Sequence, residues 1–248
     1  LIFNSGGNAP IFLYRNLGGT NFVRVTEGIG SESVAIAGAA FADFDNDGWL
    51  DLLTTPGGGF APGGGLYRNN RGVLTRNAAQ PSGISQATSA LWTDADNDGD
   101  IDMFFSITRG GFGGGNGNEA LLLNDGSGKF TRITNGVAVA SGGSSTTAAW
   151  ADYDGDGDLD AFVGNADGEV KFLFRNDGNG AFTQIFGEIA DEEGSVESAA
   201  WGDFDNDGWI DLYVANTQGE GNFLFQNRGD GSFVKVEVGS VTGERANA

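Results

Sequence analysis

The sequence predicts an all-β protein, built as a β-propeller of four-stranded blades. Two observations carry this prediction: a nine-residue aspartate loop occurs four times, and an apolar strand that ends in asparagine occurs five times, both at intervals of roughly 50 residues. Four short strands in a unit of this length match a propeller blade. Ala and Leu never recur at helical spacing over a useful length, so helices are expected to contribute little.

The aspartate loop carries carboxylates at its first, third, fifth and ninth positions and glycine at its sixth. The copies read DFDNDGWLD, DADNDGDID, DYDGDGDLD and DFDNDGWID, beginning at Asp43, Asp94, Asp152 and Asp203. Calcium takes about 6–8 oxygen ligands, and alternate residues of a tight loop can turn short side chains toward one point. The glycine permits the sharp turn, at positive φ. The pattern therefore predicts about four bound Ca²⁺ ions.

The predicted ligands are the four aspartates of each loop together with the backbone carbonyl of the seventh residue. They are Asp43, Asp45, Asp47, Trp49 and Asp51; Asp94, Asp96, Asp98, Asp100 and Asp102; Asp152, Asp154, Asp156, Asp158 and Asp160; and Asp203, Asp205, Asp207, Trp209 and Asp211. An EF-hand would place a bidentate Glu at position 12, where these loops have Thr or apolar residues. The alternative is an acidic turn without metal, but its converging carboxylates would repel one another.

Each unit can be followed in order from its first strand. A strand of small residues ends in an aromatic residue two positions before the loop, which is Phe41, Trp92, Trp150 or Trp201. The loop leads into an apolar strand such as DLYVAN, a variable hairpin, the strand that ends in asparagine, a glycine turn and a last strand such as FTRIT. We expect the aromatic residues before the loops to pack between blades.

The two ends of the chain complement each other. Residues 1–5 align with the strand that follows a loop, and residues 239–248 align with the strand that precedes one. We therefore expect one domain, 1–248, with blades at about 1–28 plus 239–248, 29–80, 81–137, 138–189 and 190–238. Pairing of the N- and C-terminal strands would close a five-bladed ring and remove exposed strand edges. The alternative is a segment of a larger ring, for example a seven-bladed one.

The composition limits the function. The net charge is −21, from 34 acidic and 13 basic residues, which argues against nucleic acid as a partner. The chain has no Cys and no His, so thiol chemistry and the commonest general base are absent. No apolar run approaches the roughly 20 residues of a membrane span. Because the aspartate clusters are assigned to metal, we expect no catalytic residues and no enzymatic activity.

Two tryptophans are candidate ligand-binding residues. Trp49 and Trp209 occupy the seventh position of two loops, where the other two loops have Asp100 and Asp158. An exposed Trp can stack against a sugar ring or a protein partner. The alternative is that each lies over the edge of its own blade. The glycine-rich hairpins 56–65 and 110–118 could carry binding or serve as spacers.

The segment from Ala199 to Phe233 reads AAWxDxDNDGxxDLxxxN…NFLFQNxGDGSF. It resembles the FG-GAP or VCBS repeats of integrin alpha-like calcium-binding β-propellers, and the resemblance covers almost the whole chain. This resemblance implies calcium loops between the first and second strands of each blade, and an extracellular or cell-surface location. It also implies a role in adhesion, glycan binding or protein contact.

Together these features predict a non-catalytic extracellular module that binds a glycan or an extracellular protein, with calcium as the staple of each blade. The first alternative is a self-associating subunit of a surface layer or filament. The second is a polysaccharide-active enzyme.

Overall fold

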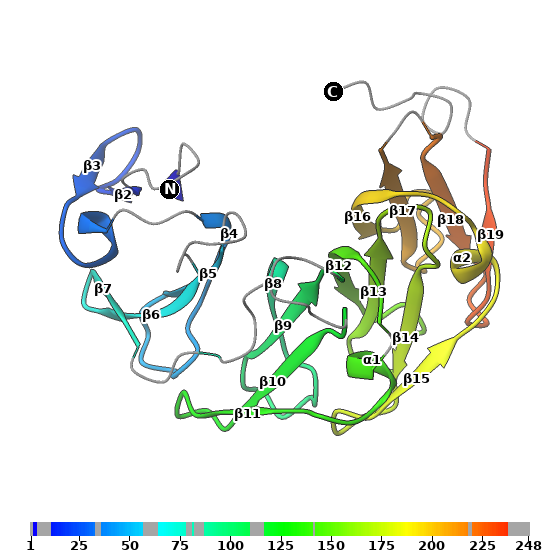
Figure 1. Cartoon of the computed structure of the whole chain (residues 1–248), viewed down its shortest axis with the longest axis horizontal. Coiled ribbons are helices and arrows are strands. Elements are labelled where there is room, and N and C mark those ends of the chain that lie inside the picture. The colour runs from blue at the N-terminus through cyan, green and yellow to red at the C-terminus, as the bar shows by residue number, and fades with distance from the viewer. Residues whose placement is uncertain are drawn as a thin grey trace.

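The computed structural model describes residues 2–3, 11–32, 36–56, 64–77, 81, 87–109, 117–140, 142–217 and 220–237. In these residues, strands β1 to β19 form five antiparallel sheets, which we number 1 to 5 in chain order. Figure 1 shows the sheets following one another along an arc, from β1–β3 to β16–β19. Neighbouring sheets from 2 to 5 contact each other through their first strands, β4, β8, β12 and β16.

The strands run in sequence order within each sheet. Sheet 1 contains β1 (Ile2–Phe3), β2 (Phe12–Asn16) and β3 (Phe22–Val25), and sheet 2 contains β4 (Ile36–Ala42), β5 (Asp51–Pro56), β6 (Gly65–Asn70) and β7 (Val73–Arg76). Sheet 3 contains β8 (Ala87–Thr93), β9 (Asp102–Ile107), β10 (Ala120–Asn124) and β11 (Phe130–Arg132). Sheet 4 contains β12 (Ser145–Ala151), β13 (Asp160–Asn165), β14 (Phe172–Asn176) and β15 (Phe182–Ile185). Sheet 5 contains β16 (Val196–Gly202), β17 (Asp211–Asn216), β18 (Phe223–Asn227) and β19 (Phe233–Lys235).

The all-β prediction is confirmed. The helices among the described residues are single turns, namely η1 (Gly28–Ser31), α1 (Val137–Ala140) and α2 (Glu188–Asp191). None of the helices in the described part of the chain is long and apolar enough to cross a membrane. The predicted terminal strand 239–248 and most of both glycine-rich hairpins lie outside the described residues.

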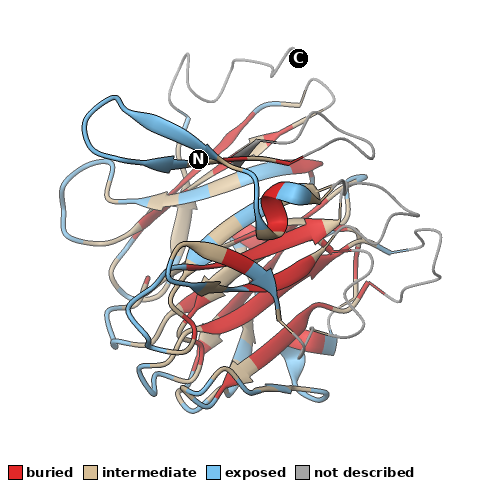
Figure 2. Cartoon of the chain, turned by 90° about the vertical axis from the view of Figure 1, so that its left-hand side faces the viewer, coloured by how far each residue is buried: buried red, intermediate tan, exposed pale blue. Residues whose placement is uncertain are grey.

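The hydrophobic core lies between the sheets. The second strands β9 and β13 are buried along their whole length, because they pair on both edges and have a neighbouring sheet on either face. One core cluster joins Phe44 and Leu53 of sheet 2 to Met103 and Phe105 of sheet 3. Figure 2 shows the buried residues in the middle of the strands and the exposed ones toward the loops.

The aromatic residues before the loops pack between sheets, as predicted. Trp92 lies with its ring centroid 6.1 Å from Phe44 of the preceding sheet, and Trp201 stacks 6.0 Å from Tyr153. Where the loop carries the small Ala95 instead, Phe104 of β9 meets the Trp150 ring edge-on at 5.2 Å. Phe41 differs, because its side chain is 40% exposed. Among the described residues, sheets 3 to 5 each receive this aromatic contact from the preceding sheet, whereas the equivalent residue of sheet 2, Phe41, is exposed.

Candidate calcium sites

Each aspartate loop is shaped by hydrogen bonds to its own first aspartate. In the first loop, Asp43 accepts hydrogen bonds from the backbone N–H groups of Asp47 (3.0 Å) and Gly48 (2.8 Å), and the other three loops repeat this pattern. Gly48 has φ 88°, and its counterparts lie between 92° and 98°. The prediction that the sixth position needs positive φ is therefore confirmed.

The ninth aspartate ties three parts of the unit together. Asp102 is buried at the start of β9, where Oδ2 accepts the Ala95 N–H (2.8 Å) and Oδ1 accepts the Asn124 N–H (2.7 Å). The loop start, the second strand and the third strand therefore meet at one carboxylate. Asp51, Asp160 and Asp211 make the equivalent bonds.

The structure brings together the first, third and ninth aspartates of every loop, with ligand oxygens that all lie within 4.8 Å of one another. The four groups are Asp43, Asp45 and Asp51; Asp94, Asp96 and Asp102; Asp152, Asp154 and Asp160; and Asp203, Asp205 and Asp211. The fifth aspartates are outside these groups, and each accepts the N–H of the seventh residue. Coordination of calcium by the aspartates of all nine-residue loops, and by the carbonyl of the seventh residue, stays a prediction.

The chemistry of these groups fits a hard cation. All donors are carboxylate oxygens, which Ca²⁺ prefers. The buried Oδ1 atoms of Asp45 and Asp96 have no hydrogen-bond partner. Burial, with neighbouring carboxylates as a further cause, raises the pKa of Asp102 and of Asp160 to about 7. A cation between the oxygens would favour the ionised form and satisfy the unpartnered atoms.

The first loop differs from the second in one neighbouring side chain. Arg68 precedes the asparagine of β6, and its Nε lies 2.6 Å from Asp45. The equivalent residue of β10 is Leu123, and that of β18 is Gln226, whose amide lies 2.5 Å from Asp205. The Arg68 guanidinium would therefore compete with a calcium ion for the Asp45 carboxylate.

Arg68→Leu, which copies the second loop, is expected to raise the calcium affinity of the first loop about fivefold. The reason is that removing one nearby positive charge relieves repulsion of about 1 kcal/mol. Isothermal titration calorimetry of wild type and variant measures this difference. The matched control Arg175→Leu removes an arginine that pairs with Asp177 rather than with a loop aspartate, and should change affinity less. An unchanged affinity for Arg68→Leu would contradict the assignment of Asp45 as a ligand.

In sheets 3 to 5, the asparagine that ends the third strand joins that sheet to the preceding one, a role that was not predicted from the sequence. The Asn176 side-chain amide donates to the carbonyls of Ala95 in the preceding sheet (2.9 Å) and of Leu159 in its own loop (3.1 Å). Asn124 and Asn227 make the same two bonds, to Phe44 and Tyr153 across the interface. The signal in the sequence was the fivefold repetition of the asparagine itself.

The two candidate ligand-binding tryptophans differ in their surroundings. Trp209 is half-buried, and its indole lies over two glycines: a Cβ on Gly155 would be 3.3 Å from the ring, and one on Gly229 would be 2.5 Å from it. Trp49 is 44% exposed and lines a hollow of about 340 Å³ between sheets 1 and 2. Of these two tryptophans, Trp49 is thus the one whose ring is available for contact with a ligand.

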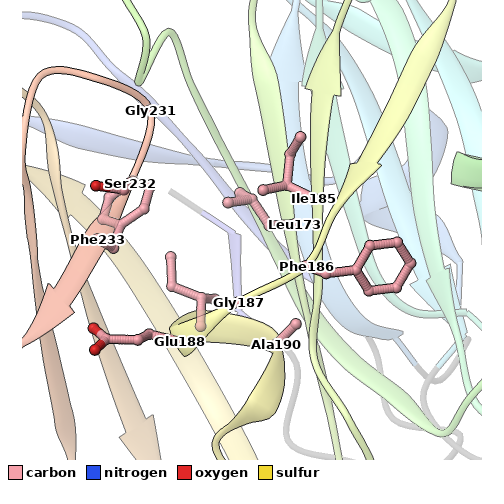
Figure 3. A pocket seen from close by; sticks show the side chains of 10 residues that line it. Leu173, Ile185, Phe186, Gly187, Glu188, Ala190, Gly231, Ser232 and Phe233 are labelled. Carbon is pink, nitrogen blue, oxygen red and sulfur yellow. The ribbon is translucent and has the colours of Figure 1, made fainter.

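A second hollow, of about 280 Å³, lies between sheets 4 and 5 (Figure 3). It is lined mainly by apolar residues, among them Leu173, Ile185 and Phe233. Its one acid, Glu188, already accepts the N–H of Lys235 at 2.9 Å, and Figure 3 shows the Phe186 ring turned away from the hollow. This hollow therefore does not present the paired carboxylates of a glycoside hydrolase.

Comparison with known proteins agrees with the repeat structure. The FG-GAP-like repeat model matches residues 1–54, 110–163, 153–214 and 203–248. Cartilage acidic protein 1 of Xenopus tropicalis is 29% identical over 184 residues, covering 69% of this chain and 27% of that protein. Its human counterpart is 27% identical over 192 residues, covering 73% and 28%. The chain thus spans little more than a quarter of the length of these curated relatives.

A solved structure shares the fold. An Agrocybe aegerita lectin, described as recognising non-reducing terminal N-acetylglucosamine, superimposes with a TM-score of 0.55 at 17% identity, covering 92% of this chain and 60% of that chain. The repeat matches extend over well more than half of the sequence, in agreement with the predicted family. The chain belongs to the FG-GAP-like repeat family.

Proposed function

We propose that the protein is a non-catalytic, calcium-binding extracellular module that presents a contact surface for a glycan or a protein. The observation that carries this proposal is the fourfold convergence of three aspartates within 4.8 Å. Each group joins the first and second strands of one sheet, so calcium would act as a staple for that sheet. A metal bound only by the folded state stabilises that state by mass action.

The proposed architecture is a propeller closed by its ends. In sheets 2 to 5 a first strand covers one edge of the second strand, whereas β1 of sheet 1 has no such neighbour among the described residues. Pairing of residues 239–248 with that edge would supply the missing strand and protect the edge. It would also complete a ring of five blades.

The proposed contact surface is the face around Trp49. The exposed indole beside a hollow suits stacking against a sugar ring or a partner side chain. The lectin with a similar fold supports a carbohydrate as one partner class. The cartilage acidic proteins support an extracellular setting only through their name.

A glycan array probed in calcium with wild type and Trp49→Ala tests this surface. Glycan signals that fall at least tenfold in Trp49→Ala would support it. Trp209→Ala is the control, because that indole is half-buried between glycines. The absence of glycan signals, together with calcium-driven self-association, would favour the surface-layer or filament alternative. Hydrolysis of a polysaccharide panel would contradict the non-catalytic assignment.

Asp96→Asn is expected to lower stability with calcium but not without it. With calcium, the loss of a ligand should lower the free energy of unfolding by about 2 kcal/mol. In chelator, the variant should be as stable as wild type or up to about 1 kcal/mol more stable, because Asp94 and Asp98 repel the charge of a desolvated Asp96. Denaturant unfolding measures both. Asp191→Asn, at an exposed acid in α2, is the control. Equal losses in both conditions would contradict a metal site.

A further inference from the structure

Every interface from sheet 2 to sheet 5 seats one side chain in an aromatic slot of the next sheet. Phe44, the second residue of its loop, lies between Trp92 and Phe130, at centroid distances of 6.1 and 5.7 Å. Tyr153 lies in the same way between Trp201 and Phe233, at 6.0 and 5.4 Å. At the interface between sheets 3 and 4 the second loop residue is Ala95, and Phe104 fills the place. The slot on each following sheet thus receives an aromatic side chain of the preceding sheet, from the loop at two interfaces and from β9 at the third.

Sheet 2 presents the same slot without an occupant among the described residues. Phe41 and Leu74 stand where Trp201 and Phe233 stand in sheet 5, and both line the hollow of about 340 Å³. The Asn69 amide donates to Leu50 of its own loop at 2.8 Å, and among the described residues it makes no bond to a preceding loop like the one that its counterparts make. Leu50 is 58% exposed. Among the described residues, no loop covers this face as loops cover the equivalent faces of sheets 3 to 5.

A second contact selects which loop fits. The fourth residue of one loop touches the seventh residue of the next: Asn46 donates to Asp100 at 2.9 Å, and Asn97 donates to Asp158 at 2.7 Å. At the last interface the fourth residue is Gly155 and the seventh is Trp209, whose ring would lie 3.3 Å from any Cβ on that glycine. An asparagine at the fourth position of one loop is therefore found with an aspartate at the seventh position of the next loop, and a glycine at the fourth position is found with a tryptophan. The seventh residue on the face of sheet 2 is Trp49, so a loop with glycine at its fourth position fits this face.

The loop of sheet 5, at the other end of the row of sheets, does not fit this face. In the loop Asp203–Asp211 the second residue, Phe204, is 44% exposed, whereas Phe44 and Tyr153 are 1% and 2% exposed. Its fourth residue is Asn206, which suits an aspartate rather than Trp49. A second copy of this chain would therefore present the mismatched loop. The occupant should come from a different repeat.

We propose that the face around Trp49 is a docking site for an aspartate loop of the same repeat type, with an aromatic residue at its second position and glycine at its fourth. The face continues the row of interfaces that sheets 2 to 5 already form. This inference rests on the proposed binding role of the Trp49 face, and it names the partner as a peptide loop rather than a sugar.

A tethered copy of segment 151–160 (ADYDGDGDLD) provides the test. Ile2 pairs with Leu13 in the same way as Tyr213 pairs with Leu224, so Ile2 corresponds to Tyr213. A loop joined directly ahead of Leu1 would therefore end at the position that corresponds to Asp211. The loop is made with glycine or asparagine at its fourth position, on chains with Trp49 or with Trp49→Asp. We expect the matched pairs, glycine with tryptophan and asparagine with aspartate, to melt about 4 °C higher in calcium than the mismatched pairs. Acrylamide quenching of tryptophan fluorescence should also fall in the glycine–tryptophan chain.

The inference is overturned if the four tethered chains melt at the same temperature, or if the gain does not depend on the pairing. It is also overturned if the untethered chain dimerises and Phe204→Ser abolishes the dimer, because the occupant is then a second copy. Calcium stoichiometry and the glycan array, measured on the untethered chain, report on the proposed function independently. Sugar binding that Trp49→Ala removes, without pairing-dependent melting, would keep the binding role and reject the loop as partner.

Discussion

Removal of calcium is expected to lower the melting temperature by roughly 20 °C or more. At free calcium about 100-fold above Kd, each site contributes about 2.7 kcal/mol to the free energy of unfolding, so four sites contribute about 11 kcal/mol. In proteins of roughly this size, about 1 kcal/mol shifts the melting temperature by about 2–4 °C. The effect is large because every sheet from 2 to 5 has its own group of three aspartates. Differential scanning calorimetry with calcium and with chelator measures it.

Magnesium is the matched control for this experiment. It demands near-ideal octahedral geometry at about 2.0–2.1 Å and gives up its water reluctantly, so it should restore little of the lost stability. Atomic absorption on the dialysed protein should find about four calcium ions per chain. A protein that melts at the same temperature in chelator, and that retains no calcium, would show that the loops are acidic turns without metal.

The strand order and the aspartate groups could be predicted from the sequence because they depend on local spacing. Alternate aspartates around a glycine turn can converge whatever the rest of the molecule does, and four aspartates of each loop were predicted to share one site. The structure brings the first, third and ninth of them together, whereas the fifth lies outside the group. The structure adds that Asp102 closes the loop on two backbone N–H groups, one of them from the third strand.

The contacts between sheets could not be predicted in this way. The loops containing Trp49 and Trp209 differ in sequence only at the eighth residue, Leu50 or Ile210, yet one indole is 44% exposed and the other is half-buried. The difference arises from the sheet that precedes each loop. Sheet 4 brings Gly155 over Trp209, whereas no described residue of sheet 1 covers Trp49 with such a loop. The bond from Asn46 to Asp100 likewise joins residues 54 positions apart. Single-loop patterns carry no information about such neighbours.

Asn176→Ala is expected to destabilise the protein by about 4 kcal/mol, with or without calcium. Asn176 is fully buried, and the change removes its bonds to the carbonyls of Ala95 and Leu159 and to the N–H of Gly178 (3.1 Å). Buried polar groups left without a partner cost about 1–3 kcal/mol each. Guanidinium unfolding, followed by far-ultraviolet circular dichroism in calcium and in chelator, measures the loss.

Asn69→Ala is the matched control, since Asn69 occupies the same repeat position on the uncovered face. Its amide donates to Leu50 at 2.8 Å, and its Oδ1 accepts the Gly72 N–H at 2.7 Å, but it is half-buried and makes no bond to a preceding loop in the part of the chain that the structure describes. Water can replace these bonds, so we expect a loss of about 1 kcal/mol. Equal losses for the two variants would mean that the asparagine acts only within its own sheet. A loss for Asn176→Ala that disappears in chelator would mean that it acts through the calcium site. A larger loss of stability for Asn176→Ala than for Asn69→Ala, both with and without calcium, would instead show that a polar contact separate from the metal holds the sheets together.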